Sequence, residues 1–584
     1  MRTSAGPVLI LAGAGSGKTR GITYRIAHLI ENQRVRPENI LAVTFTNKAA
    51  EQMRNRVNAL LRSLRTGNPM IATFHSFCVR VLRRQISAIG YGNDFTIYDD
   101  ADQLSLVKSC LKELDLDEKL VAPRFALSRI GYAKNHGITP EGAYQQAYDA
   151  KTEKIAVIYE LYEKKLRQAN ALDFDDLLLK TVLLLDQHPS LRESLNRQYP
   201  YVMVDEYQDT NRPQYHLIRR LTEVQQNLCV VGDEDQSIYS WRGADIQNIL
   251  SFEKDYPNAK IIKLEQNYRS TSNILDTAGA LVANNEARKG KTLWTERIGG
   301  DPVALFEAPD AEAEALFVAQ QILEHQRRYP SDAAAVLYRT NFQSRLFEEA
   351  CRRSGIKYSV VGGFSFYERT EIKDLLSYLK LCLNPNDSVS LLRVINTPAR
   401  GIGKTSLDNL ELEARQRGSS LWEALQQTLT QKSVAGRTLR AFSDFFSLMQ
   451  EFVEASKNLP VAELIRLIIN RSGYVPWLRE EGTEEALTRL DNLQELANAA
   501  LDGQDRGETL REFLDHAALV SDTDDYNERS KVTLMTLHSA KGLEFPLVFV
   551  VGLEEGLFPH SRSLSSSADI EEERRICYVG MTRA

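Results

Sequence analysis

The sequence predicts an α/β fold made of two domains with parallel sheets, each carrying a largely helical insertion. Short apolar runs alternate with longer amphipathic stretches, which is the pattern of strands buried between helices. Two long segments break this alternation and repeat their apolar residues at helical spacing. The length of 584 residues leaves room for about four domains of roughly 150 residues each.

The first element is an apolar strand, 8–11, that leads directly into the loop AGAGSGKTR, 12–20. A buried strand, a glycine-rich turn and the start of a helix form a cradle for the phosphates of a nucleoside triphosphate. Gly13, Gly15 and Gly17 let the backbone turn tightly enough for successive N–H groups to face phosphate oxygens. An ordinary glycine turn is the alternative, but strand, loop and GKT occur here in the required order.

Two side chains at the start of the following helix have specific roles in such a loop. Lys18 reaches the β- and γ-phosphates, and the Thr19 hydroxyl binds Mg²⁺. Ala12 stands where the motif usually has its first glycine, which the looser form of the motif tolerates. The predicted nucleotide-binding residues of the loop are Ala12, Gly13, Ala14, Gly15, Ser16, Gly17, Lys18, Thr19 and Arg20.

Further apolar runs are each predicted to be a strand buried on both faces. They are residues 40–45, 201–206, 228–233, 333–339, 532–538 and 547–552. The two helical segments cover roughly 91–195 and 365–527. The predicted domains are therefore a first α/β domain (1–90 and 196–266) with its insertion (91–195), and a second α/β domain (267–364 and 528–584) with its insertion (365–527).

Composition is that of a large cytoplasmic enzyme. No apolar stretch approaches the roughly 20 residues of a membrane span, and six scattered cysteines indicate neither a zinc site nor a disulfide framework. The net charge of −6 argues against a polyanionic partner, but residues 1–90 hold 14 Lys and Arg against 3 Asp and Glu. Such asymmetry is typical of nucleic-acid surfaces, although solvated helix faces also produce it.

The string VDEYQDTN, 204–211, supplies the second part of a nucleotide site. A buried strand that ends in two carboxylates places Asp205 where it binds the Mg²⁺ also held by Thr19. Glu206 then faces the γ-phosphate and orients and deprotonates a water. A surface acidic turn is the alternative, and a phosphotransferase would need an acceptor pocket of which the sequence shows no sign.

Taken together, the motifs resemble those of superfamily 1 DNA helicases of the UvrD/Rep/PcrA group. They occur in that family's order over the whole chain: AGAGSGKTR, AVTFTNKAAEQM (42–53), ATFHSF (72–77), LDFDDLL (172–178), VDEYQDTN, VVGDEDQSIYSWRGAD (230–245), LEQNYRS (264–270), TLHSAKGLEFPLVF (536–549) and EEERRICYVGMTRA (571–584). The resemblance implies two RecA-like P-loop motor domains that clamp one ATP and bind single-stranded DNA.

The resemblance also implies roles at the nucleotide. Gln236 matches the γ-phosphate sensor, and Tyr268 the residue that stacks on adenine. Arg269 and Arg583 match the residues that neutralise charge on the transferring phosphoryl group, and Glu544 matches the ribose contact. For each of these arginines, the alternative is an ordinary ion pair with no role at the nucleotide. The family usually has an adenine-reading glutamine before the first strand and a strand after the second arginine; this sequence shows neither, so we expect weaker adenine preference and poorer coupling.

Single-stranded DNA is held by aromatic rings that stack on bases and by polar groups on phosphates. Phe45, Tyr239 and Trp241, with Arg242 beside it, form the expected stacking surface. Trp241 lies in a polar string, which predicts exposure, whereas Phe45 ends an apolar strand and has core packing as its alternative. By resemblance, the residues expected on the DNA backbone are Thr46, His75, Ser539 and His560.

A second GKT lies in RGIGKTSL, 400–407. Pro398 stands five positions before Gly403, within the helical insertion, so the segment does not predict a second ATP site. In the family it resembles a helix-hairpin-helix loop whose backbone amides contact duplex phosphates. A plain helix cap at Thr405 is the equal alternative.

The sequence thus predicts an enzyme that uses ATP and Mg²⁺ to move along single-stranded DNA and to unwind duplex at single/double-strand junctions, in repair or replication and with proteins of those processes as partners. The 3′ to 5′ direction comes from the resemblance alone. Two alternatives remain: a DNA-stimulated ATPase that displaces proteins with little unwinding, and a non-enzymatic DNA-binding module.

Overall fold

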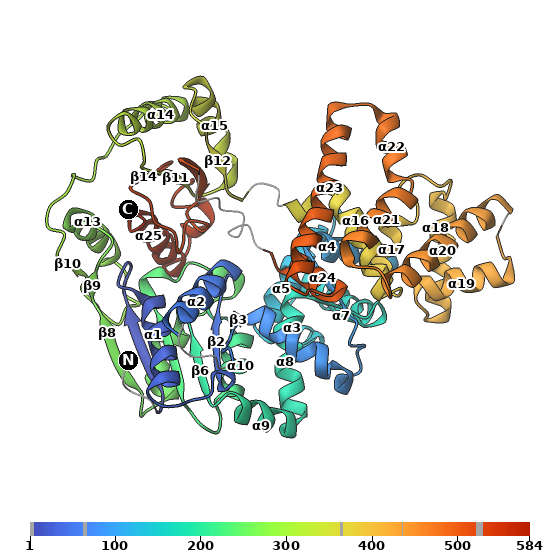
Figure 1. Ribbon diagram of the computed structural model, residues 1–584, viewed down its shortest axis with the longest axis horizontal. Coiled ribbons are helices and arrows are strands. Elements are labelled where there is room, and N and C mark those ends of the chain that lie inside the picture. The colour runs from blue at the N-terminus through green and yellow to red at the C-terminus, as the bar shows by residue number, and fades with distance from the viewer. Residues whose placement is uncertain (1–4, 62–66, 363–365, 435, 521–529) are drawn as a thin grey trace. The chain divides into compact units, whose positions relative to one another are not determined.

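The computed structural model describes residues 5–61, 67–362, 366–434, 436–520 and 530–584. The chain forms two compact units (Figure 1). Unit 1 consists of Met1–Phe77, Leu185–Gly363 and Ser521–Ala584, and unit 2 of Cys78–Leu184 and Phe364–Val520. Among the helices of the described ranges, none combines the length and apolarity that crossing a membrane requires.

Unit 1 contains a parallel sheet with the strand order β3-β2-β6-β7-β1-β8. The strands are β1 (Val8–Ala12), β2 (Ile40–Thr44), β3 (Met70–Thr73), β6 (Tyr201–Val204), β7 (Leu228–Gly232) and β8 (Lys260–Leu264). The central strands are buried on both faces, because α1 (Lys18–Glu31) and α2 (Asn47–Leu60) supply apolar residues to the core around β1 and β2. Since β6, β7 and β1 are neighbours, the segments that follow their carboxyl ends meet at one edge of the sheet.

A second parallel sheet in unit 1 has the order β12-β13-β11-β14. Its strands are β11 (Ala334–Tyr338), β12 (Ser359–Val360), β13 (Val532–Thr536) and β14 (Leu547–Val550). The pair β9 (Gln266–Asn267) and β10 (Trp294–Thr295) is separate. Other helices of unit 1 are α9 (Pro189–Gln198), α10 (Arg212–Leu221), α11 (Gln247–Leu250), α12 (Phe252–Asp255), α13 (Ser272–Val282), α14 (Ala311–Arg328), α15 (Ser344–Arg353) and α25 (Ser567–Met581).

Unit 2 is mainly helical. Its first part holds α4 (Asp100–Glu113), α5 (Pro123–Asn135), α6 (Pro140–Gln145), α7 (Ala150–Gln168) and the strands β4 (Thr96–Tyr98) and β5 (Ala171–Asp173). Its second part holds α16 (Thr370–Leu383), α17 (Ser388–Val394), α18 (Lys404–Arg417), α19 (Leu421–Gln431), α20 (Gly436–Ser456), α21 (Val461–Arg471), α22 (Tyr474–Glu481), α23 (Glu484–Asp505) and α24 (Leu510–Leu519). The helices α3 (Phe74–Gln85) and α8 (Phe174–Gln187) run from one unit into the other.

A buried ion cluster lies in the first part of unit 2. Lys134, on α5, has no exposed side-chain surface, and its Nζ atom lies 2.6 Å from Glu163, 2.7 Å from Asp173 and 3.0 Å from Asp176. Burial opposes the charged form of Lys134, but the three carboxylates raise its pKa well above the usual value. The cluster therefore joins α5, α7, β5 and α8 through one ammonium group.

The α/β fold with parallel sheets is confirmed, and each predicted strand is present. The strands end before the polar residues at their carboxyl ends, and β14 is half-buried along its whole length, so the prediction of burial on both faces is wrong there. The edge strands β3 and β8 were not predicted. The division into four domains stays a prediction, and its boundaries at 364/365 and 527/528 touch residues outside the described ranges.

Candidate active site

The loop between β1 and α1 has the backbone conformation that its glycines were expected to allow. Gly15 and Gly17 have φ angles of 63° and 85°, in the left-handed region that side chains disfavour. The Ser16 hydroxyl donates to the Gly13 carbonyl oxygen over 2.7 Å. No acidic residue lies in the first turn of α1, so the partial positive charge of the helix N-terminus is left for an anion.

A second segment holds this loop from the side. The Asn267 amide donates to the Ala14 carbonyl oxygen over 2.7 Å, and the Tyr268 backbone N–H donates to the Gly15 carbonyl oxygen over 3.0 Å. A Cβ atom at Gly15 would lie 2.5 Å from Asn267 Nδ2, so this close approach also requires glycine. The Tyr268 ring itself is 61% exposed beside the loop. The stacking of this ring on adenine stays a prediction.

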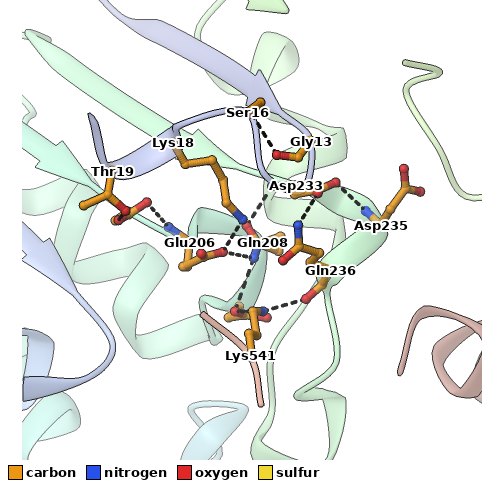
Figure 2. A network of polar contacts seen from close by, with 12 residues as sticks. Gly13, Ser16, Lys18, Thr19, Glu206, Gln208, Asp233, Asp235, Gln236 and Lys541 are labelled. Carbon is orange, nitrogen blue, oxygen red and sulfur yellow. Dashed lines mark hydrogen bonds and ion pairs between the residues drawn. The ribbon is translucent and has the colours of Figure 1, made fainter. Parts of the chain in front are cut away.

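The acidic pair after β6 faces the start of α1. Thr19 Oγ1 donates to Asp205 Oδ2 over 3.2 Å, and Lys18 Nζ lies 3.0 Å from Glu206 Oε2. Figure 2 shows Lys18 extending from the loop to Glu206. Glu206 has a φ of 50°, a left-handed conformation that is uncommon for a residue with a side chain. Such strain is held in place only where the surroundings define the conformation, which is typical of functional sites.

Charge is divided unequally within the acidic pair. Burial acts to raise the pKa of Glu206, but Lys18, Lys541 and the Gln208 amide outweigh it and lower that pKa to about 2. Burial and the neighbouring Glu206 charge raise the pKa of Asp205 to about 7. Glu206 therefore carries a negative charge at neutral pH, as a proton acceptor must.

Polar contacts continue from Glu206 across the carboxyl end of β7 (Figure 2). Gln208 Nε2 donates to Glu206 Oε2 over 2.6 Å, and Gln208 Oε1 accepts from the Asp233 backbone N–H over 2.9 Å. Gln236 Nε2 donates to Asp233 Oδ2 over 2.5 Å. Lys541, which follows β13, donates to the Asp209 carboxylate and, over 2.6 Å, to the Gln236 carbonyl oxygen. The segment after β13 thus contacts the polar network at the carboxyl edge of the first sheet directly.

The two predicted arginines take different positions. Arg583 is buried, and its side chain donates to the carbonyl oxygens of Val579 and Leu543 and, over 3.4 Å, to Gln236 Oε1. Burial and the nearby Arg269 charge lower the pKa of Arg583 to about 9. Arg269 Nε donates to Glu544 Oε2 over 2.9 Å. The structure therefore brings Arg583 to Gln236 and pairs Arg269 with Glu544.

An aromatic cluster with one exposed ring, Trp241, and two half-buried rings, Tyr239 and His538, follows the 3-10 turn that contains Gln236. The Trp241 ring is 63% exposed, and its centroid lies 6.5 Å from that of Tyr239 and 6.2 Å from that of His538. The Arg242 guanidinium lies 4.7 Å from the Trp241 centroid. The Tyr239 hydroxyl donates to the His538 carbonyl oxygen over 3.2 Å. Aromatic faces with a guanidinium beside them are a surface for stacking nucleic-acid bases.

Three further predicted DNA contacts, Phe45, Thr46 and His75, lie at the carboxyl ends of β2 and β3. Phe45 is half-buried and meets Phe74 edge to face, with centroids 5.5 Å apart. The Thr46 hydroxyl caps α2 by accepting from the Ala49 N–H. Burial and the Arg242 charge lower the pKa of His75 to about 4, so its imidazole is neutral at neutral pH.

The side chains of Ser539 and His560 each make a hydrogen bond within a local turn. Ser539 Oγ and Thr536 Oγ1 share a hydrogen bond of 2.9 Å, and His560 Nδ1 accepts from the Arg562 N–H over 3.2 Å. The His560 backbone N–H donates to a Glu573 carboxylate oxygen over 3.2 Å.

Comparison with known proteins agrees with this geometry. Residues 1–257 match the model of the UvrD/REP helicase N-terminal domain, and residues 262–584 match that of the UvrD-like helicase C-terminal domain. The chain belongs to the UvrD/Rep helicase family. Proteins named ATP-dependent DNA helicase PcrA from Staphylococcus epidermidis and Bacillus subtilis are 46% and 47% identical to the whole chain, which covers 81% and 80% of their lengths. One from Staphylococcus aureus is 45% identical, with 81% of its length covered.

His538 and Lys541 are among the residues at this site for which the sequence does not predict a role. His538 lies at the aromatic cluster, and burial together with the charges of Arg339 and Arg242 lowers its pKa to about 3. Lys541 contacts both the acidic string after β6 and Gln236. Both lie in the string TLHSAKGLEF, for which the resemblance predicts roles for Ser539 and Glu544 alone. The apolar residues of that string predict a strand, but they do not indicate which side chains contact the first sheet.

The residues present fit the Mg²⁺ ion that the sequence predicts. The Thr19 hydroxyl and the Asp205 carboxylate lie together at the start of α1, and both are hard oxygen ligands of the kind that Mg²⁺ prefers. A bound cation there favours the ionised form of Asp205.

The segment with the second GKT begins a helix. Gly403 is the N-cap of α18, and Thr405 lies within the first turn, so the alternative of a cap at Thr405 is wrong. Gly401 has a φ of 76°, which allows the tight turn before this helix. Contact of the loop with duplex phosphates stays a prediction.

Proposed function

We propose that this ATP-dependent DNA helicase moves along single-stranded DNA in the 3′ to 5′ direction and separates duplex at single/double-strand junctions, in DNA repair or replication and together with proteins of those processes. One observation carries the proposal. Lys541 and Arg583, from the region of the second sheet, contact the backbone and side chain of Gln236, and Tyr239 follows three residues later in the aromatic cluster. The proposed nucleotide-binding surface and the proposed DNA-binding surface therefore share one short segment, which includes Gln236 and Tyr239.

The chemistry that we propose is hydrolysis of the terminal phosphate of ATP. Lys18 and the loop amides bind the phosphates, while Glu206 orients a water and accepts its proton. Mg²⁺, held by Thr19 and Asp205, supplies neutralising charge when bound. Arg269 and Arg583 neutralise charge that develops on the transferring group, and Glu544 binds the ribose.

On the DNA side, Trp241 and Tyr239 stack on bases, and Arg242 adds a cation beside them. Phe45, which packs against Phe74 with ring centroids 5.5 Å apart, extends this surface. Thr46, His75, Ser539 and His560 contact the DNA backbone. Closure around ATP moves Lys541 and Arg583 relative to Gln236, so the position of Tyr239 and Trp241 depends on the state of the nucleotide.

Strand displacement tests the proposal. A duplex with a 3′ single-stranded tail should be unwound in the presence of ATP and Mg²⁺, and a duplex with a 5′ tail should not. Equal unwinding of both substrates would contradict the direction. DNA-stimulated ATP turnover without displacement of either strand would instead favour the removal of proteins from DNA as the function.

A further inference from the structure

A buried lysine beside Gln236 lies outside the helicase motifs described above. Lys291, between α13 and β10, has a side chain that is 1% exposed, and its Nζ atom lies 2.6 Å from Asp233 Oδ1. The same atom lies 3.0 Å from Glu234 Oε2 and 2.7 Å from Asp235 Oδ2. Three consecutive acidic side chains therefore meet at one ammonium group.

Arg288 supplies a second cation to this acidic string, Asp233–Asp235. Its guanidinium makes two hydrogen bonds to the Asp235 carboxylate, of 2.7 and 2.8 Å. Burial acts to lower the pKa of Lys291, but the three carboxylates raise it well above the usual value. Both cations are needed because buried carboxylates so close together repel one another strongly when unpaired.

The acidic string connects directly to the proposed γ-phosphate sensor. Asp233 Oδ2 accepts from the Gln236 amide over 2.5 Å, and the Asp233 backbone N–H donates to Gln208 over 2.9 Å. Gln208 in turn donates to Glu206. Loss of the position of Asp233 would therefore release the Gln236 side chain and one support of Glu206.

The segment that carries Lys291 also contacts the phosphate loop. Leu293, two residues further on, lies so close to Gly13 that a Cβ atom there would be 2.2 Å from Leu293 Cδ2. Its other packing partners include Ala14 and Tyr578. The segment therefore spans from the phosphate loop to the acidic string.

We propose that Lys291, supported by Arg288, is a positioning residue for ATP hydrolysis, which holds Asp233, Glu234 and Asp235 together so that Gln236 remains directed at the bound nucleotide. The inference rests on the proposed function, in which Gln236 senses the γ-phosphate. The side chain of Lys291 does not touch the nucleotide itself, and it acts through Asp233.

The test is Lys291→Met, which keeps length and removes the charge. With saturating single-stranded DNA, kcat for ATP should fall at least about 10-fold, while KM for ATP stays within about threefold, because the contacts of the phosphate loop remain. The matched control is Lys289→Met in the same segment, whose ammonium pairs with the 57% exposed Glu253. This control should keep the kcat of the parent.

Two further variants separate positioning from loss of folding. The double variant Lys291→Met with Glu234→Gln removes one carboxylate together with the ammonium group. It should recover part of the kcat that Lys291→Met alone loses. Arg288→Gln, at a side chain that is 19% exposed, should lower kcat about threefold or more with KM unchanged. If Lys291→Met does not fold, the kcat of Arg288→Gln tests the positioning role instead.

Parental kcat in Lys291→Met would overturn the positioning role, and so would a raised KM with kcat unchanged. Parental kcat in Arg288→Gln would overturn it where Lys291→Met does not fold. A parent protein without DNA-stimulated turnover would instead remove the proposed function, so the two failures are distinguishable.

Discussion

At the scale of single residues, Glu206 is the side chain on which hydrolysis is expected to depend most. Its carboxylate accepts from both Lys18 and Gln208, and its backbone adopts a left-handed conformation. Glu206→Gln should retain ATP binding and lower kcat by about 100-fold or more, because the amide accepts no proton from water. Steady-state turnover and nucleotide titration measure the two effects. Turnover within tenfold of the parent would exclude Glu206 as the general base.

Trp241 is the corresponding residue on the DNA side. Its ring is 63% exposed, with Arg242 beside it. Trp241→Ala should weaken binding of single-stranded DNA by about 1–3 kcal/mol, the contribution of one stacked base, with ATP turnover in the absence of DNA unchanged. Fluorescence anisotropy of a labelled oligonucleotide measures this affinity. Trp294→Ala is the control, since that ring is also half-exposed in unit 1; equal effects of both variants would argue against a stacking role.

At the scale of elements, the phosphate loop depends on the segment after β8 as well as on its own glycines. Gly15→Ala introduces a side chain at a φ of 63°, where the residue conformation costs about 1–2 kcal/mol. The new Cβ atom also meets Asn267 Nδ2, which would have to release the Ala14 carbonyl oxygen. We expect KM for ATP to rise at least about tenfold. The control Gly279→Ala, at a helical glycine with open space around it, should leave KM unchanged; an unaltered KM in Gly15→Ala would show that the loop tolerates the change.

The ion cluster around Lys134 makes a separate prediction for unit 2. Lys134→Met leaves Glu163, Asp173 and Asp176 with Lys180 as their remaining close cation among the described residues, and Lys180 Nζ lies 2.8 Å from Glu163. Removing one partner of a buried ion pair costs about 3–5 kcal/mol. Thermal or urea unfolding should show this loss, whereas ATP affinity should remain that of the parent. A free energy of unfolding equal to the parent's would mean that the carboxylates relax or take up protons.

At the scale of the whole molecule, the fold was predictable where strands are continuous apolar runs. The central strands β1, β2, β6 and β7 are of this kind, because a short continuous apolar run predicts a strand that is buried on both faces. The edge strand β8 is exposed or half-buried at every position, and β3 is short, so neither gives that signal. The small pair β4 and β5 lies within a helical region and has only three residues in each strand.

The site was predictable to the extent that motifs name residue types at fixed spacing. The contacts of Lys18 with Glu206 and of Thr19 with Asp205 follow from the parallel strands β1 and β6, which lie on either side of β7 and end at the same edge of the sheet. Lys541, His538 and Lys291 were missed because their roles depend on which segments meet in space. Lys291 is a lysine in a charged loop in the sequence, and only the three buried carboxylates around it distinguish it from a surface residue.

The central claim is that the chain is a motor in which DNA and ATP act on one another through the segment from Gln236 to Trp241. ATP turnover measured with and without single-stranded DNA tests it most directly. The account predicts slow turnover alone and an increase of at least about tenfold with saturating DNA, an effect of about 1.4 kcal/mol on the activation barrier. Turnover that is absent, or equal with and without DNA, would contradict it.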